Sequence, residues 1–139
     1  SVFEDNSALN NLDLSKNQIN FLNESLFRHL LSLENLNLNT NKLANIQNWT
    51  FKGLFNLINL NLSNNKIIFI QKNSFADLFN LKILDLGKNP FMSINYLGKL
   101  NSLRNFYIKP DIFENKANLE VFLNMIKAKF YKTSLFNQI

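Results

Sequence analysis

The stretch that decides the fold is Leu33-Glu-Asn-Leu-Asn-Leu-Asn-Thr-Asn-Lys-Leu43, which follows the pattern Leu-x-x-Leu-x-Leu-x-x-Asn-x-Leu. The same pattern, with other apolar residues in some positions, begins at residues 9, 57 and 81, so it returns every 24 residues. The intervening columns repeat too, with phenylalanine at 27, 51 and 75 and leucine at 30, 54 and 78. A constant step of this length indicates a chain built from stacked, similar units.

Each unit predicts one short strand and one return segment. The alternation around Leu36 and Leu38 is typical of a strand with one buried face. One copy cannot bury that face alone, so the copies must stack into a parallel sheet with strands about 4.8 Å apart. The return segment carries the phenylalanine column and is bulkier than the strand. We therefore expect the stack to curve, with the sheet on its concave face.

An asparagine follows each strand, at Asn17, Asn41, Asn65 and Asn89. A side-chain amide both donates and accepts hydrogen bonds. Buried at the turn, each amide could bond backbone groups of its own coil and of the adjacent one. We therefore predict a structural ladder of asparagines along the stack.

The repeat resembles the leucine-rich repeat family. The 24-residue step and the spacing Phe27-x-x-Leu30-x-x-Leu33 are similar to the typical subclass, which occurs in Toll-like receptor ectodomains and related recognition proteins. The resemblance covers residues 3 to about 108. It implies an α/β solenoid, a curved coil with a short-stranded parallel sheet on its concave face.

The domain organisation follows from where the repeat holds. Residues 1–113 are expected to be repeats, with a partial unit at 1–8, four regular units from residue 9 and an irregular fifth from residue 103. Phe3 lies 24 residues before Phe27, so the chain is expected to be a fragment of a longer protein. Asn89-Pro90-Phe91 resembles the start of a C-terminal cap, but the cysteines of such a cap are missing, so the irregular repeat is favoured.

Residues 114–139 are expected to form a C-terminal helical cap or a degenerate repeat. Leu119, Phe122, Leu123, Ile126 and Phe130 follow helical spacing, which predicts an amphipathic helix over about 115–132. A cap over the end of the stack is the favoured role. A helix that docks a partner or lies on a membrane surface is the alternative.

The composition argues against catalysis and against a metal or cofactor site. The chain has no cysteine and a single histidine, which excludes a disulfide scaffold and a thiol nucleophile. Asp13 and Asp85 occupy the same strand position three units apart, so they should lie about 14–15 Å apart, whereas paired glycosidase carboxylates need about 5–9.5 Å. No apolar stretch is long enough to span a bilayer. We expect no enzyme activity, no metal, no cofactor and no membrane span.

The candidate ligand-binding residues are the strand positions that point away from the core, because in this fold the concave face is the usual recognition surface. The alternative is a merely solvated, Asn-rich face. The candidates are Asn11, Asp13, Asn35, Asn37, Asn59, Asn61, Asp85, Arg104, Asn105 and Tyr107.

The resemblance favours a non-enzymatic recognition module, part of an extracellular, innate-immune type of receptor that binds a protein, glycan or pathogen-derived ligand. The alternative is an intracellular, cytoplasmic scaffold or adaptor, with which the absence of cysteine also agrees. The net charge of +5 rests on dispersed lysines, so nucleic-acid binding is disfavoured.

Three N-glycosylation sequons occur, at Asn23, Asn48 and Asn61. Their number is no more than the composition predicts, so it is no evidence for secretion. Asn23 and Asn48 fall at expected turns, whereas Asn61 falls on the concave face. Phe21 and Phe69 would mark a lateral apolar strip if both are exposed.

Overall fold

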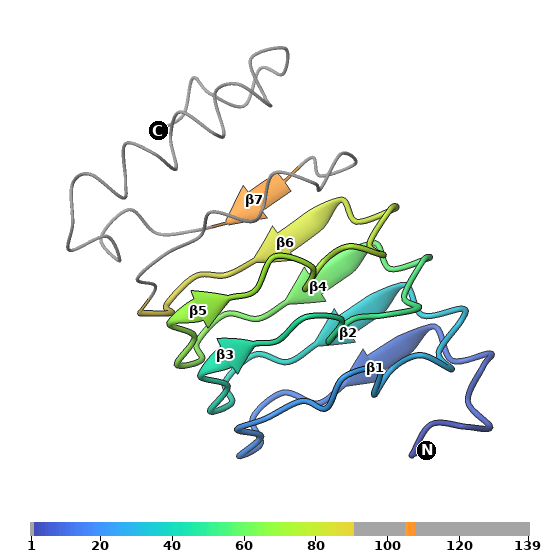
Figure 1. Cartoon of the computed structure of the whole chain (residues 1–139), viewed down its shortest axis with the longest axis horizontal. Helices are drawn as coiled ribbons and strands as arrows, with labels where there is room; N and C mark the ends of the chain where they lie inside the picture. The colour runs from blue at the N-terminus through green and yellow to red at the C-terminus, as the bar shows by residue number, and fades with distance from the viewer. Residues whose placement is uncertain (1, 91–104, 108–139) are drawn as a thin grey trace, which may run out of the picture.

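The computed structural model describes residues 2–90 and 105–107, which form short strands joined by turns (Figure 1). Five strands carry the Leu-x-Leu half of the repeats and two shorter ones lie in the return segments. In chain order they are β1 (Asn11–Asp13), β2 (Asn35–Asn37), β3 (Asn45–Ile46), β4 (Asn59–Asn61), β5 (Phe69–Ile70), β6 (Ile83–Asp85) and β7 (Asn105–Tyr107).

The main sheet is parallel, with strand order β1-β2-β4-β6-β7. Its register pairs Leu12 with Leu36, Leu36 with Leu60 and Leu60 with Leu84, so each strand sits one 24-residue unit from the next. Leu84 pairs with Phe106 in β7, where the step is shorter. The expected solenoid of short parallel strands is confirmed.

The core is a stack of identical layers. Leu36, Leu38 and Leu43 of one coil are almost fully buried, and their counterparts in the next coil are equally so. On the return side, the phenylalanine rings of successive coils are stacked, with centroids 5.9 Å apart for Phe3–Phe27, 6.2 Å for Phe27–Phe51 and 5.7 Å for Phe51–Phe75. This phenylalanine spine ties neighbouring coils together opposite the main sheet.

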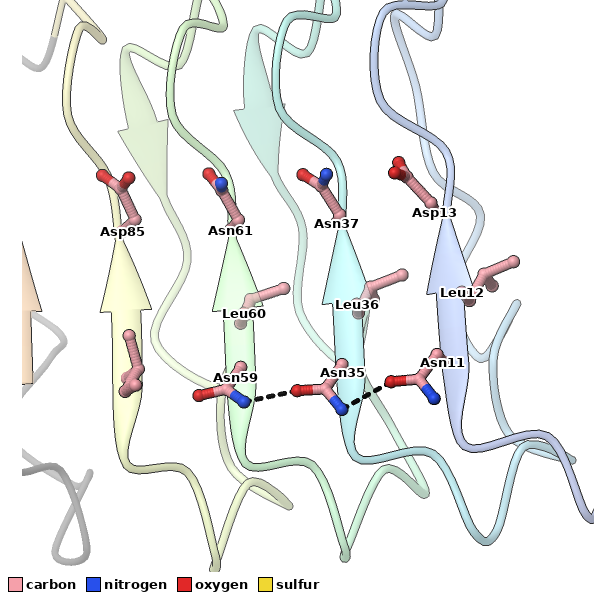
Figure 2. Close-up of a pocket in the computed structure, with 11 residues that line it drawn as sticks. Asn11, Leu12, Asp13, Asn35, Leu36, Asn37, Asn59, Leu60, Asn61 and Asp85 are labelled. Atoms are coloured by element: carbon pink, nitrogen blue, oxygen red, sulfur yellow. Dashed lines mark hydrogen bonds between the residues drawn. The ribbon is translucent and has the colours of Figure 1, made fainter.

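The described return segments are runs of tight turns. Within one coil, Arg28 N–H donates to the Ser25 carbonyl, Leu30 N–H to Phe27 and Leu33 N–H to Leu30, each three residues back. The pairing of β3 with β5 forms a second, two-stranded parallel sheet, which lies behind the main sheet in Figure 2. The sequence pattern did not predict this second sheet.

The turn after each strand uses left-handed backbone at the same repeat position. The φ angles are 54° at Lys16, 56° at Thr40, 53° at Asn64 and 55° at Lys88. Non-glycine residues rarely adopt this conformation, and asparagine does so more easily than most. This left-handed residue therefore turns the chain out of the strand and into the return segment.

The domain boundaries 1–113 and 114–139 and the helix expected over about 115–132 fall on residues outside the described part of the chain. They stay predictions. Among the residues that the structure describes, no helix is long and apolar enough to cross a membrane.

The concave face as a candidate binding surface

The main sheet brings most of the predicted ligand-binding residues together on one surface. Figure 2 shows two rows of polar side chains, one across β1, β2 and β4 and one across β1, β2, β4 and β6. Together with Leu12, Leu36, Leu60 and Ile83, they line a shallow hollow of about 530 Å³. Its polar residues are Asn11, Asp13, Asn35, Asn37, Asn59, Asn61 and Asp85. Asn105 and Tyr107 belong to β7, the next strand of the sheet, and Arg104 lies outside the described residues.

The first row is a chain of amides at the start of β1, β2 and β4. Asn35 Nδ2 donates to Asn11 Oδ1 at 2.6 Å, and Asn59 Nδ2 donates to Asn35 Oδ1. All donations run toward β1. Asn59 Oδ1 therefore faces β6, where the register places Ile83, and this buried oxygen has no hydrogen-bond donor. We call Asn11, Asn35 and Asn59 the concave amide row.

The second row ends each strand and consists of Asp13, Asn37, Asn61 and Asp85. In each case the side-chain Oδ1 accepts the backbone N–H two residues later, from Ser15 at 2.8 Å in the first coil to Gly87 at 2.8 Å in the fourth. This local turn holds the side chains in one orientation. Hydrogen bonds from Ser15, then from Asn37, together with the charge of Lys16, hold the pKa of Asp13 below its usual range.

Behind the sheet, the turn asparagines bond two coils at once. Asn65 Nδ2 donates to the carbonyls of Leu62 in its own coil and Leu38 in the preceding coil, both at 3.0 Å, while its Oδ1 accepts Leu43 N–H at 3.1 Å. Asn41 and Asn89 make the equivalent bonds. All three side chains are buried.

Asn17 differs from the expectation that all four ladder asparagines are buried. It is exposed, and its Nδ2 bonds only the carbonyls of Leu14 and Ser15 in its own coil. The reason is its position, because β1 is the edge strand of the described sheet and no preceding coil covers the amide. The burial of this asparagine depends on a neighbour and not on its own sequence.

The described part of the concave face offers a surface of polar side chains for contact. Three strand steps separate Asp13 in β1 from Asp85 in β6. Within residues 2–90 and 105–107, no group of three or more His, Asp or Glu side chains is placed to hold a metal ion. What the concave face can do chemically is form hydrogen bonds through fixed amides and carboxylates.

Two sets of apolar side chains lie outside this face. Phe21 and Phe69 are both exposed, at 56% and 41%, but Asn45 occupies the corresponding position in the coil between them. A second column, Leu31, Phe55 and Phe79, is also exposed, and the rings of Phe55 and Phe79 are stacked at 6.0 Å. Sequence reasoning missed this column, although its 24-residue step was a visible signal.

Comparison with known proteins agrees with this geometry. The leucine rich repeat family pattern matches residues 31–91. The structure of the Drosophila Toll–Spatzle complex aligns with 77% of the chain at 30% identity and a TM-score of 0.68, and its glycosylated form with 78% at 29% identity and 0.73. The TLR13–ssRNA13 complex aligns with 74% of the chain at 34% identity and 0.69.

These alignments cover only 15–17% of the matched chains, so the chain spans about a sixth of those proteins. Among curated proteins, no sequence matches the chain. The same fold is indicated by the repeat pattern, the 24-residue register, the turn asparagines and the similar solved structures. Residues 31–91 belong to the leucine-rich repeat family, and the coils of the chain resemble those of Toll-like receptor ectodomains.

Proposed function

We propose that the chain is a recognition module that binds a protein ligand through its concave face, and that it acts by binding without catalysis. The observation that supports this is the pair of polar rows on the in-register strands, one across three strands and one across four. Their side chains are oriented by hydrogen bonds and are not used in the core. Because these side chains are already fixed, binding costs little ordering of the protein.

A protein ligand fits the charge of this face better than a nucleic acid. Strands β1, β2, β4 and β6 contain two carboxylates, Asp13 and Asp85, and no lysine or arginine. Affinity for nucleic acid depends on cations that neutralise phosphates. The neighbouring TLR13 structure is a complex with single-stranded RNA, but the described strands here lack the basic residues for that chemistry.

The proposed setting is extracellular, as part of a receptor ectodomain. The support is the structural similarity to Toll. The Toll–Spatzle complex is described as a molecular hub in Drosophila development and innate immunity. The present chain spans about a sixth of that protein. The ligand and the signalling role of a whole receptor are therefore proposed for this chain and not taken from that protein.

The test is a binding screen with matched variants. The chain, tetramerised on streptavidin, is applied to an array of recombinant extracellular proteins, an array of glycans and a set of single-stranded RNAs. Asn37→Arg places a long charged side chain in the middle of the concave face. Asn45→Arg is the control, because Asn45 is exposed in β3 on the opposite side.

We expect hits among the proteins that weaken at least tenfold with Asn37→Arg and persist with Asn45→Arg. Hits that are lost only with Asn45→Arg would move the binding surface to the convex side and contradict the proposal. Hits confined to RNA would contradict the ligand class.

A further inference from the structure

The three sequons differ in where they place their acceptor amide. We propose that Asn23 and Asn48 carry N-linked glycans on the convex side of the stack, whereas Asn61 does not. The proposal rests on the extracellular setting proposed above. In the reaction, Nδ2 forms a bond to C1 of the first sugar of a polyprenyl-diphosphate-linked oligosaccharide. The polyprenyl diphosphate leaves, and the amide loses one proton.

Asn48 bonds the next coil through its carbonyl oxygen and its backbone N–H. The residue is exposed and follows β3, so it lies on the side opposite the main sheet. Its Oδ1 accepts the N–H of Asn73 at 3.0 Å, and its own N–H donates to Gln71 Oε1 at 2.8 Å, both in the next coil. These bonds fix the carbonyl side of the amide against the stack. Nδ2, the atom that a glycan would modify, takes no part in them.

Asn23 lies in the corresponding turn of the first coil, one residue earlier than Asn48, because the residue 24 positions after Asn23 is Gln47. Asn23 is exposed, and its backbone carbonyl accepts Leu26 N–H at 3.2 Å, so the turn is closed by the main chain. The left-handed residue of this turn is Ser25, the third residue of the first sequon, in one coil and Trp49, the second residue of the other sequon, in the next, each with a φ of 58°. Both sequons thus lie in the same kind of turn, where an added sugar displaces no core side chain.

Asn61 lies in the opposite environment. It is half-buried in β4, and its Oδ1 accepts both the N–H of Ser63 at 3.0 Å and its hydroxyl at 2.7 Å. That hydroxyl also accepts Asn39 Nδ2 at 2.7 Å, and Ser63 is only 8% exposed. The neighbouring strands place Asn37 and Asp85 one step, about 4.8 Å, to either side. A sugar here would cover the hollow of the concave face.

The experiment is translation of the full chain behind a cleavable signal peptide in the presence of microsomes, with glycans counted as endoglycosidase-sensitive gel shifts. We expect two glycans on the parent chain, one on Asn23→Gln, one on Asn48→Gln and none on the double variant. Asn45→Gln is the matched control, since it changes an exposed convex-side asparagine outside any sequon and should keep both glycans.

Occupancy is then assigned by peptide mapping after enzymatic deglycosylation in ¹⁸O-water, which marks each formerly glycosylated asparagine. Label on residues 23 and 48 alone supports the proposal. A chain without glycan, or label on residue 61, overturns it. The readout needs no ligand, so its failure is separate from a failure of concave-face binding, which the Asn37→Arg variant reports.

Discussion

At the scale of single residues, the buried turn asparagine cannot be replaced by an apolar residue without the loss of several hydrogen bonds. Its amide supplies a donor and an acceptor to backbone groups that the strand leaves unpaired at its end. Two of these groups belong to the preceding coil, so each asparagine links two coils. A more apolar residue would fit the position and leave the backbone groups unsatisfied.

Asn65→Leu should therefore destabilise the protein. The change strips hydrogen bonds from Leu43 N–H and from the carbonyls of Leu38 and Leu62. Each buried group left unsatisfied costs about 1–3 kcal/mol, so we expect a loss of about 3 kcal/mol or more in urea unfolding. Asn17→Leu is the control and should cost less than about 1 kcal/mol, because Asn17 is exposed. Equal losses in both variants would contradict the role of burial.

The left-handed turn position gives a second residue-scale prediction. Thr40 is β-branched and has a φ of 56°, whereas Asn64 fills the same position of the next coil with a φ of 53°. Thr40→Asn removes the hydroxyl that accepts Asn64 Nδ2 at 2.9 Å, an exposed hydrogen bond, but should still raise stability, because asparagine tolerates left-handed backbone better. The reciprocal Asn64→Thr should lower it. Thermal unfolding of both variants checks the sign, and a destabilising Thr40→Asn would be inconsistent with this explanation.

At the scale of strands, the concave amide row has a direction and an end. Each amide donates toward β1, and the row stops at β6, where Ile83 replaces asparagine. The last acceptor, Asn59 Oδ1, is buried without a donor. The sheet thus carries one unsatisfied group where the side-chain pattern of the row changes.

Ile83→Asn should supply the missing donor. The new amide would donate to Asn59 Oδ1 as Asn59 donates to Asn35, at the expense of apolar contacts of a half-buried isoleucine. Ile83→Ala loses similar contacts and adds no donor. We expect Ile83→Asn to be more stable than Ile83→Ala by about 1–3 kcal/mol, the usual cost of an unsatisfied buried group. If chemical unfolding shows Ile83→Asn to be less stable than Ile83→Ala, the missing donor to Asn59 Oδ1 does not limit the stability of the row.

Strand-level features divide into those that the sequence could predict and those that it could not. The inward leucines and outward asparagines followed from the period of two, and the register followed from the 24-residue step. The direction of the amide row could not be predicted, because an asparagine side chain can flip its donor and acceptor. Exposure of Leu31, Phe55 and Phe79 was also hidden, since a repeated apolar column looks the same whether it faces the core or solvent.

At the scale of the whole molecule, the stack is held along its length by two continuous features, the turn asparagines beside the sheet and the phenylalanine spine on the return side. Each coil contacts mainly its neighbours, so stability depends on interfaces between coils. A substitution in the middle of the spine removes ring contacts with both neighbouring coils and so weakens two interfaces.

Phe51→Ala should destabilise the protein strongly, because Phe51 is the spine residue of the central coil. The ring is 1% exposed and stacks on Phe27 at 6.2 Å and Phe75 at 5.7 Å. Deleting a buried phenylalanine costs about 3–5 kcal/mol, which calorimetry would detect as a large fall in Tm. Phe21→Ala, which removes a 56% exposed ring, should change stability by less than about 1 kcal/mol. A comparable fall in both would mean that the spine does not carry the coil interfaces.

The central claim is that the outward residues of the main sheet contact a protein ligand while the inward residues maintain the fold. The most direct measurement places a small diazirine amino acid at position 37 or at position 45 and irradiates each chain with a protein hit from the screen. We expect a covalent adduct from position 37, on the concave face, and none from position 45. An adduct from position 45 alone, with none from position 37, would contradict the account.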